Sequence, residues 1–485
     1  METAKVEYKY EQYIGGKWVS ALNHGTWDVL NPATEEVVRV VPFGAGADCR
    51  VALEAAAAAF PAWSRLTAYA RAIILKRTAD LIRERVEELC HVTVLESGKP
   101  LLQAKGEWGV AADLFEWFAE EGKRAYGRVI PSRNASRRLI VLRQPLGVVG
   151  VITAWNFPIY NVARASAAAL AAGCTVVIRP SEYTPLTAML LINLLAEAGV
   201  PDGVANLING DPASMAQEML DNQLCAKIHF TGSQRVGRLL MDGASKTITR
   251  LSLELGGNAP VLIFPDVDLD QVAAGAIIAK FRNAGQVCVS PQRFFVHHSI
   301  VASFSEKVAA LSKKLQLGDG LDAATQVGPL INSAQRDRVE EMVQKSVLQG
   351  ARILCGGRRP DALARGYFYE PTVLTEVNAG SPIFAEEVFG PVLPITSFEE
   401  TKAVIRQANF TRHGLAAYVW TNDLRVAQET SEQLEYGLIG INDWAPQATE
   451  GPFTGWKESG IGRESGQEGL DEYLETKLIA LGGIS

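Results

Sequence analysis

The stretch KIHFTGSQRVGRLL (residues 227–240) combines an apolar strand-like run, a turn of small residues and the beginning of a helical pattern. Small residues at such a turn let a phosphate group approach free backbone N–H groups at the start of the helix, where the helix dipole is positive. Gly232, Ser233 and Gly237 are therefore candidate dinucleotide-binding residues. The chain carries no GxGxxG after its first strand, and Arg238 stands where a Walker loop requires Lys. An ordinary strand-to-helix turn stays open as the alternative.

Strand and helix patterns alternate on both sides of this stretch. Towards the N-terminus the sequence predicts strands at 138–143, 148–153, 175–180 and 205–208, and helices at 48–63, 70–89, 188–199 and 215–220. Towards the C-terminus it predicts strands at 259–264, 293–296 and 473–481 and a helix at 272–282. The first helix is expected to end near Pro61. Alternation of this kind indicates an α/β fold with parallel sheets covered by helices.

The composition is that of a large globular protein. The 485 residues are enough for about three domains or two large ones. A net charge of −7 without any polybasic run disfavours a nucleic-acid partner, because such binding depends on clustered cations. The six cysteines include no CxxC pair, so we expect neither a disulfide framework nor a metal site.

A membrane location is not expected either. Residues 144–163 are uncharged and long enough to span a bilayer, but they contain prolines and asparagines and fit a buried strand followed by a helix better. The N-terminal residues lack the basic start and apolar run of a signal peptide. We therefore expect a cytoplasmic protein.

A second candidate for cofactor binding is VVIRPSEYTP (residues 176–185), which places polar side chains directly after a strand. Ligands bind at this carboxyl edge in parallel sheets. Glu182 could accept hydrogen bonds from ribose hydroxyls and would repel a 2′-phosphate, whereas Arg179 and Ser181 could hold such a phosphate. The balance favours NAD and leaves NADP possible. A solvated turn begun by Pro180 is the ordinary alternative.

Six segments in register resemble the aldehyde dehydrogenase superfamily over nearly the whole chain: TAWNFP (153–158), FTGSQRVG (230–237), LELGGN (253–258), FRNAGQVCVSP (281–291), EEVFGPV (386–392) and PFTGWKESGIGRESG (452–466). The resemblance implies a Rossmann-like cofactor domain, an α/β catalytic domain and a small β bridging element for oligomerisation, in a homodimer or homotetramer. We assign residues 1–123 and 146–255 to the dinucleotide-binding domain, 256–455 to the catalytic domain, and 124–145 and 466–485 to the bridging strands.

The chemistry that the resemblance implies can be checked against the residues. An aldehyde carbon becomes a good hydride donor only after a nucleophile adds to it, and Cys288 supplies a thiolate for that addition. The side-chain amide of Asn156 and the backbone N–H of Cys288 could stabilise the resulting oxyanion. Glu254, between two leucines, could activate the water that releases the acid. The resemblance adds further cofactor-binding positions at Thr153, Trp155, Leu255, Glu387 and Phe389.

Two arginines bear on the substrate. Arg164 and Arg282 lie near the motifs and resemble the branch of the family that acts on carboxylate-bearing semialdehydes, such as succinic semialdehyde and 2-oxoglutarate semialdehyde. Two guanidinium groups can clamp a carboxylate with charge-assisted hydrogen bonds. The loop 443–451, with Trp444 and Gln447, is expected to line the substrate entrance.

Other functions remain open from the sequence. Arg164 and Arg282 could be structural, and the enzyme would then oxidise aromatic or aliphatic aldehydes. A non-catalytic dinucleotide-binding protein is a further alternative, although Cys288, Glu254 and Asn156 are all present. One departure from the family concerns the proton path. The Lys common nine residues after the motif Asn is Ala165 here, so Glu464 would have to act through water.

Overall fold

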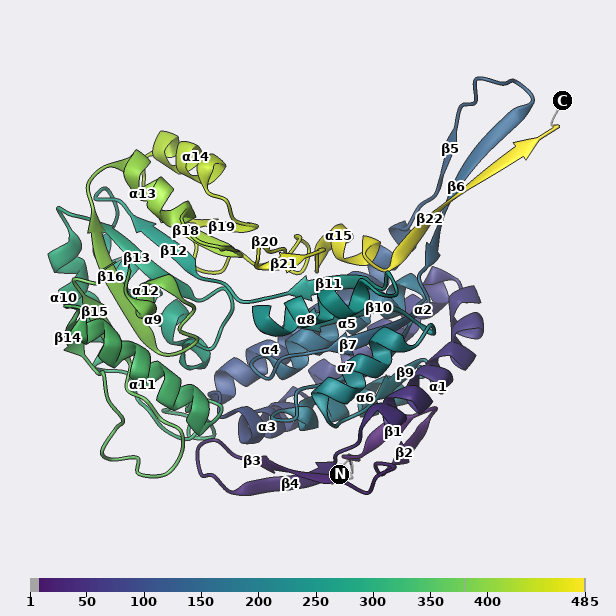
Figure 1. Cartoon of the computed structure of the whole chain (residues 1–485), viewed down its shortest axis with the longest axis horizontal. Helices are drawn as coiled ribbons and strands as arrows, with labels where there is room; N and C mark the ends of the chain where they lie inside the picture. Colours follow the sequence, from purple (N-terminus) through teal and green to yellow (C-terminus); the bar gives the residue numbers. More distant parts are fainter. Residues whose placement is uncertain (1–7, 379, 484–485) are drawn as a thin grey trace.

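Two mostly parallel sheets form the body of the molecule in the computed structural model, which describes residues 8–378 and 380–483 (Figure 1). The fold is α/β, as the sequence predicts. The outermost parts of the proposed domain segments 1–123 and 466–485 lie outside the described residues.

The first sheet has eight strands in the order β2-β1-β9-β8-β7-β10-β11-β21. Its five central strands are parallel: β7 (Val148–Ile152), β8 (Thr175–Arg179), β9 (Ala205–Leu207), β10 (Cys225–Thr231) and β11 (Arg250–Glu254). The edges are antiparallel: β1 (Gln12–Ile14), β2 (Lys17–Val19) and β21 (Gly460–Ile461). Strands β7 and β8 are buried along their whole length, because helices cover both faces of the sheet.

The helices of this half come mostly from the first 250 residues. They are α1 (Gly46–Arg65), α2 (Ala68–Glu84), α3 (Val86–Ser97), α4 (Leu101–Glu121), the 3₁₀ turn η1 (Gly122–Arg124), α5 (Pro158–Ala172), α6 (Pro185–Glu197), α7 (Pro212–Asp221) and α8 (Gln234–Ala244). The short helix α15 (Gly466–Asp471) packs against α5 from the far end of the chain.

The second sheet has seven strands: β14 (Arg352–Cys355), β15 (Thr372–Thr375), β16 (Val392–Phe398), β13 (Pro291–His297), β12 (Ala259–Ile263), β18 (Ala416–Trp420) and β19 (Leu438–Ile441). Its helical elements are α9 (Leu269–Phe281), the 3₁₀ turn η2 (Arg282–Gly285), α10 (Val301–Ser312), α11 (Ser333–Leu348), α12 (Pro382–Ala385), α13 (Thr401–Asn409) and α14 (Leu424–Gln433). The carboxyl ends of β10 and β11 and the turn before β13 bring the two halves together.

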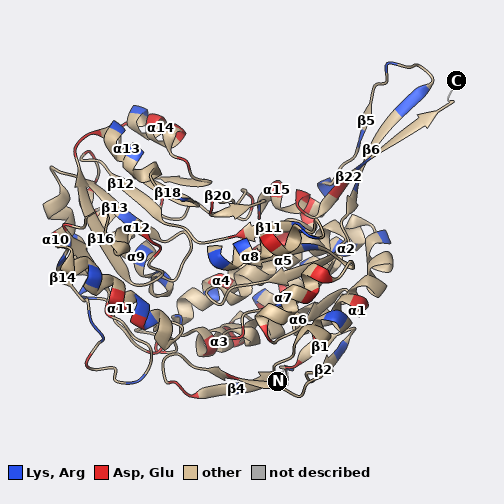
Figure 2. Cartoon of the chain, viewed as in Figure 1, with Lys and Arg blue, Asp and Glu red and all other residues tan. Residues whose placement is uncertain are grey.

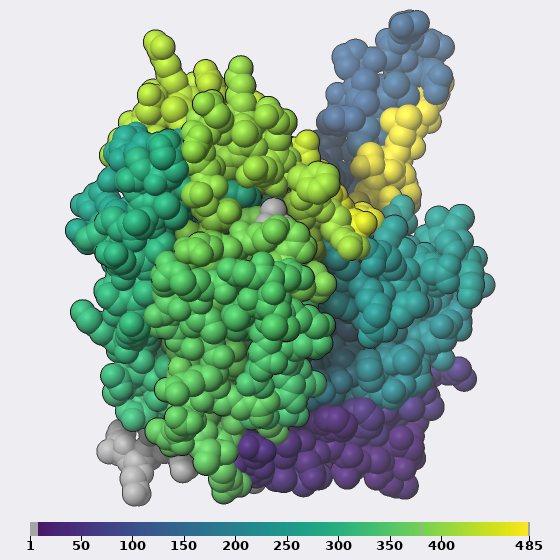
Figure 3. All heavy atoms as spheres, turned by 60° about the vertical axis from the view of Figure 1, so that its left-hand side comes forward, coloured from purple at the N-terminus to yellow at the C-terminus, as the bar shows by residue number. Residues whose placement is uncertain are grey.

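A three-stranded arm projects from the body and carries the C-terminal strand (Figure 1). It consists of β5 (Arg128–Ile130), β6 (Arg137–Pro145) and β22 (Leu474–Gly482), in the order β22-β6-β5. Figure 3 shows residues of the two chain segments packed together and standing clear of the body. Two further ribbons pair β3 (Thr26–Leu30) with β4 (Val37–Pro42) and β17 (His413–Gly414) with β20 (Trp456–Lys457).

Most helix boundaries differ from the sequence expectation by one to three residues, and two of the differences have a clear physical reason. Helix α1 continues past Pro61 to Arg65. Proline removes one backbone hydrogen bond, but Pro61 lies on the exposed side, where water can bond the freed carbonyl. The pattern at 70–89 is divided between α2 and α3, with a break at Arg85, whose backbone is not helical. Both helices face the same core, so the apolar rhythm does not reveal the break.

Charged side chains of both signs are spread over the helices of the body (Figure 2). None of the helices described here is long and apolar enough to cross a membrane.

Candidate active site

Two cavities meet at Cys288. The first, of about 550 Å³, contains the carboxyl ends of β10 and β11, and we call it the strand-end cavity. The second, of about 420 Å³, contains Arg164 and Arg282, and we call it the arginine cavity. Cys288 and Asn161 line both. A thiol at such a junction can react with a molecule that enters from one cavity while a second molecule occupies the other.

The turn that carries Cys288 is tightly constrained. It follows η2, in which Asn283, Ala284 and Gly285 all have positive φ. A side chain at Gly285 would come within 2.1 Å of the Gly390 carbonyl oxygen, so only glycine fits there. Likewise, a Cβ atom at Gly257 would lie 2.4 Å from the Cys288 carbonyl oxygen. These two close approaches fix the backbone that presents the sulfur.

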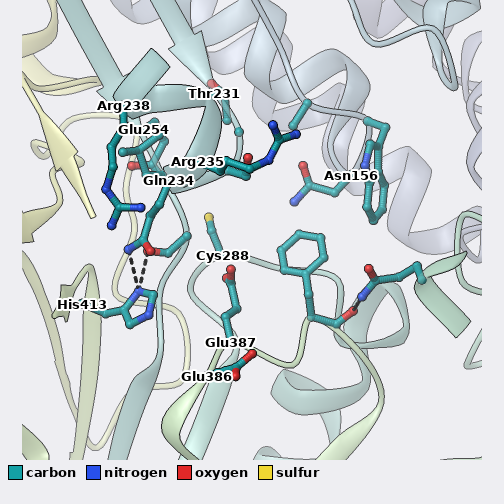
Figure 4. Close-up of a pocket in the computed structure, with 18 of the residues that line it drawn as sticks. Asn156, Thr231, Gln234, Arg235, Arg238, Glu254, Cys288, Glu386, Glu387 and His413 are labelled. Atoms are coloured by element: carbon teal, nitrogen blue, oxygen red, sulfur yellow. Dashed lines mark hydrogen bonds between the residues drawn. The ribbon is translucent and has the colours of Figure 1, made fainter. Parts of the chain in front are cut away.

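Glu254 lies at the end of β11, close to the Cys288 thiol (Figure 4). Both side chains line the strand-end cavity, and each affects the pKa of the other. Burial raises the pKa of Glu254 well above its ordinary value, and the charge of Glu464 raises it further. Burial, followed by the charge of Glu254, raises the pKa of Cys288 in the same way. The thiol is therefore protonated at rest, next to a carboxyl group that is a stronger base than a solvated one.

Asn156 stands on the other side of the sulfur in Figure 4. It belongs to the turn between β7 and α5, and Pro158 takes the first position of that helix. Its side-chain nitrogen donates to the Gln286 carbonyl at 3.1 Å, which ties it to the Cys288 turn. The backbone N–H of Cys288 makes no hydrogen bond among the described residues. Both groups are thus near the position where an oxyanion on a Cys288 adduct would form.

A buried ion pair that the sequence analysis missed supports this turn. Lys99, paired with Glu107, donates to the Asn156 carbonyl at 2.9 Å. Glu107 accepts the backbone N–H groups of Ile159 and Tyr160 at 2.9 and 3.1 Å, and so caps α5 in place of an N-cap side chain. In the sequence, Lys99 is a lysine before a proline and Glu107 is a glutamate within a helical pattern. Nothing in that pattern predicts that the two side chains form an ion pair.

The strand-end cavity has features suited to a dinucleotide. Gly232 and Ser233 line it at the start of α8, where the first N–H groups of the helix are available to a phosphate. Trp155 and Phe389 line it as an edge-to-face aromatic pair with ring centroids 5.4 Å apart. Among the other predicted cofactor residues, Leu255 and Glu387 also line it.

Glu387 lines this cavity beside Glu386, and its side chain points towards Cys288 (Figure 4). Its carboxylate accepts the Gly257 N–H at 3.1 Å. Burial raises the pKa of Glu387 to about 7. It can therefore accept hydrogen bonds from hydroxyl groups most strongly at and above neutral pH.

Five predicted cofactor residues lie outside this lining: Thr153, Arg179, Ser181, Glu182 and Gly237. A side chain at Gly237 would come within 2.9 Å of Leu255, so its glycine makes room for packing instead of contacting the cavity. Arg179 donates to Glu182 at 2.8 Å and to the Gly210 carbonyl at 2.7 Å. Thr153 joins the ends of β7 and β8, since its N–H donates to the Arg179 carbonyl, and the Ser181 hydroxyl accepts the Tyr183 N–H within its turn.

The arginine cavity contains three of the four predicted substrate residues: Arg164, Arg282 and Gln447. Arg164 is buried on α5 and ion-paired with Glu464 at 2.6 Å, while its Nε and Nη1 have no hydrogen-bond partner in the described chain. The Arg282 guanidinium lies 5.4 Å from the centroid of the Phe157 ring. The Gln447 amide oxygen is buried and also lacks a partner among residues 8–378 and 380–483.

Trp444, the fourth of these residues, is not part of the lining of the arginine cavity. It packs among Phe294, Tyr418 and Trp420, with ring centroids 4.8 to 6.3 Å apart. The flat apolar ring is accommodated by the aromatic core and by the space above Gly275. The walls of the cavity next to the arginines are formed by Phe157, Tyr160 and Phe453 instead.

Comparison with known proteins identifies relatives over nearly the full length. Residues 18–479 match the model of the Aldehyde dehydrogenase family. The succinate-semialdehyde dehydrogenase [NADP(+)] GabD of Escherichia coli is 44% identical, and the alignment covers 98% of each chain. A glutarate-semialdehyde dehydrogenase of Pseudomonas putida is 43% identical with the same coverage. Among solved structures, betaine aldehyde dehydrogenase of Staphylococcus aureus in complex with NAD+ is 36% identical, with a TM-score of 0.96 over 99% of this chain and 96% of that one.

Proposed function

The chain belongs to the aldehyde dehydrogenase family, and from that premise we propose that it oxidises a carboxylate-bearing semialdehyde to the acid through a thioester on Cys288, with NAD(P) as oxidant. One observation carries the proposal: Cys288 lies where a cavity suited to a dinucleotide meets a cavity that contains two arginines. The two relatives described above are both dehydrogenases of dicarboxylic semialdehydes.

The first step needs a thiolate. Because the pKa of Cys288 is raised, its thiol must lose its proton before the sulfur adds to the aldehyde carbon. As the C–S bond forms, the carbonyl oxygen becomes an oxyanion. The Asn156 amide and the Cys288 N–H are the donors for it, and losing one such donor costs about 3 kcal/mol of barrier lowering.

The dinucleotide supplies the acceptor for the hydride that leaves the adduct. On the protein side, Gly232, Ser233 and the start of α8 would hold phosphate, and Glu387 would accept hydrogen bonds from a ribose. Trp155 and Phe389 would lie on either side of the space for the nicotinamide ring.

Hydrolysis of the thioester needs a base and a water molecule. Glu254 removes a proton from the water molecule while the water oxygen bonds to the acyl carbon. The C–S bond then breaks, and its electron pair remains on the Cys288 sulfur. The raised pKa of Glu254 suits this task, since a base works best when its pKa lies near the working pH.

The carboxylate of the substrate is proposed to bind Arg282 and the free nitrogens of Arg164. Arg164 is partly neutralised by Glu464, but its Nε and Nη1 have no acceptor in the described chain. Buried donors of this kind favour a ligand that accepts their hydrogen bonds. The Gln447 amide, also without a partner at its oxygen, offers a further polar contact.

A second candidate function is the oxidation of aromatic or aliphatic aldehydes. The observation in its favour is the apolar part of the arginine cavity, which includes Phe157, Val110 and Phe453. Steady-state assays with succinic, glutaric and 2-oxoglutarate semialdehydes, benzaldehyde and hexanal separate the two. We expect kcat/KM to be at least about tenfold higher for the acidic aldehydes, as one charge-assisted hydrogen bond would give. Equal values across the panel would refute the carboxylate clamp.

We propose NAD as the preferred cofactor. Arg179 is engaged by Glu182 and the Gly210 carbonyl, so it is less available to a 2′-phosphate, and Glu182 would repel that group. The relatives include an enzyme named for NADP(+) and a structure with NAD+, so both dinucleotides need to be compared in the assay.

We also propose that the arm of β5, β6 and β22 joins copies of the chain. Several of its apolar side chains are exposed, among them Val129 at 71% and Leu478 at 59%. Exposed apolar side chains grouped on one projecting sheet favour burial against a second copy. In this scheme residues 124–145 and 466–485 serve assembly, residues 1–123 and 146–255 bind the dinucleotide, and residues 256–455 complete the catalytic half. Light scattering of a Val129→Asp, Leu478→Asp variant tests the assembly.

A further inference from the structure

A buried histidine lies behind the candidate active site. His229 is on β10, and its Nε2 lies 2.5 Å from the Glu464 carboxylate. The side chains of both residues are almost completely enclosed, at 1% and 6% exposure. Its other ring nitrogen, Nδ1, lies 3.0 Å from the Tyr473 hydroxyl. His229 thus joins a buried carboxylate on one side to a buried hydroxyl on the other.

This group is next to the proposed base. In the parallel register of β10 and β11, His229 pairs with Ser252, two residues before Glu254. Since side chains two apart on a strand share a face, His229 and Glu254 project from the same face of the sheet on adjacent strands. Glu464 interacts with both: it contacts His229, and its charge raises the pKa of Glu254.

Two nitrogen-containing side chains contact Glu464. One is the Arg164 guanidinium, at 2.6 Å, which stays protonated at any physiological pH. The other is the His229 imidazole, at 2.5 Å, a ring that in its neutral form has one nitrogen able to accept a proton. The position where the family commonly has a lysine is Ala165 in this chain, which has no proton to exchange. Of these two groups, only the His229 imidazole can therefore pass a proton to or from Glu464.

We propose that His229 is a positioning residue for thioester hydrolysis, which takes up through Glu464 the proton that Glu254 removes from water. The inference rests on the proposed thioester chemistry. The O–H bond of water breaks, its electron pair forms the C–O bond, and the proton moves to Glu254. It then passes by way of the Glu464 carboxylate to Nε2 of neutral His229. Glu254 is ionised again, and the imidazolium is stabilised by the Glu464 charge and by the Tyr473 oxygen.

The surroundings favour storage of a proton there. The titratable and charged groups around His229 and its partner Tyr473 come from several elements: Glu254 on β11, Glu464 before α15, Arg164 on α5, Glu472 before β22, Lys227 on β10 and Cys174 before β8. Lys227 is ion-paired with Glu472 at 2.8 Å, so their charges largely offset each other. Arg164 and Glu464 form the second pair. Among the described residues, each cation near His229 is therefore paired with a carboxylate. A positive charge added to His229 meets no uncompensated positive charge.

The test uses the intact enzyme with a His229→Gln substitution. Glutamine can still donate to Glu464 but cannot take up a proton. We expect rapid mixing to show an undiminished first turnover, with about one reduced cofactor per site, followed by a steady-state kcat lower by about 10²-fold. In the unmodified enzyme kcat should fall more steeply as the pH is lowered than it does in the variant, because only the imidazole can be blocked by a proton that it already carries. The fall that remains in the variant would come from Glu254, whose pKa is raised. Unchanged kcat and an unchanged pH profile would overturn the proposal.

Two further variants separate proton transfer from structural support. Tyr473→Phe removes only the hydroxyl on Nδ1 and should shift the pH profile of kcat while retaining the first turnover. Lys227→Gln changes a buried residue on the same strand and face that contacts Glu472 instead. It should lower Tm without altering that profile; the same kinetic change in this variant would contradict the relay. If the unmodified enzyme reduced no cofactor with any aldehyde, the proposed function itself would be wrong.

Discussion

The two cavities that meet at Cys288 differ in how they are built. Most of the strand-end cavity is made from the ends of β10 and β11 and from turns within short sequence motifs, with side chains of α11 and of residues 412–413 completing the lining. The arginine cavity is made from side chains of α4, α5, the turn after α9 and the loop near Gln447, which are far apart in the sequence. Local sequence therefore predicts much of the first cavity, whereas the second depends on how distant segments come together.

The cavities also differ in their buried charged groups. Glu254 and Glu387, buried carboxyl groups with raised pKa values, lie on the strand-end side, whose arginines (Arg235, Arg238, Arg338 and Arg412) are at least partly exposed. Arg164 and Arg282 lie on the other side. A substrate with an aldehyde at one end and a carboxylate at the other would be oriented by this difference, with its aldehyde at the sulfur. Substitutions on each side should then affect different kinetic parameters.

The largest effect is expected where the cavities meet. Cys288→Ala removes the nucleophile on which both sides converge, so kcat should fall by at least about 10³-fold for every aldehyde. The measurement is steady-state cofactor reduction with acidic and neutral substrates. Cofactor binding, followed by quenching of tryptophan fluorescence, should be retained because the strand-end lining is otherwise intact. Substantial oxidation by this variant would contradict a covalent route.

A substitution on the arginine side should act on substrate binding alone. Arg282→Ala should raise KM for succinic semialdehyde by about 10- to 100-fold, as expected for loss of a hydrogen bond between charged groups. KM for hexanal should change little and serves as the control. Arg282 is the cleaner position to test, because Arg164→Ala would also leave Glu464 without its ion-pair partner. An equal loss with both aldehydes would make Arg282 structural.

A substitution after β8, outside the lining of the strand-end cavity, should alter cofactor choice. Glu182→Gln removes the carboxylate that engages Arg179, and frees this arginine for a 2′-phosphate. We expect the ratio of kcat/KM for NADP to that for NAD to rise by about tenfold, with KM for the aldehyde unchanged. The ratio is measured with one aldehyde at saturation. If it is the same in the variant and the unmodified enzyme, Glu182 and Arg179 do not determine the choice between NAD and NADP.

The smallest effect concerns pH. Burial raises the pKa of Glu387 to about 7, so its carboxyl is neutral below that pH and ionised above it. The ionised form accepts hydrogen bonds more strongly, and the Kd for oxidised cofactor should therefore rise by about fivefold from pH 8 to pH 6. Fluorescence titration measures this. In Glu387→Gln the Kd should be nearly independent of pH, and a slope as steep as in the unmodified enzyme would assign the titration to another group.

Features that depend on local sequence could be predicted, whereas features that depend on contacts between distant segments could not. The α/β fold and the family are confirmed, because alternating strands and helices and six motifs in register are local features. The loop near Gln447 shows the limit. Trp444 and Gln447 are three residues apart without any periodic pattern, and one turns into the aromatic core while the other lines the cavity. No local rule assigns these directions.

Buried charged residues form the second limit. Lys99, Glu107 and His229 are single polar residues in otherwise ordinary segments, and their partners lie on other elements. A charged residue is normally solvated, so the sequence alone favours that interpretation. Only the assembled structure shows that Lys99 and Glu107 hold the Asn156 turn and that His229 meets Glu464.

Mass spectrometry of Glu254→Gln gives the most direct test of the covalent route. With a saturating acidic semialdehyde and NAD(P), the first turnover should reduce about one cofactor per site and then stop, because no base remains to activate water. Digestion of the trapped protein should show the acyl mass on the peptide that contains Cys288. Cofactor reduction in this variant with no acyl group on Cys288, or with continued rapid turnover, would contradict the account.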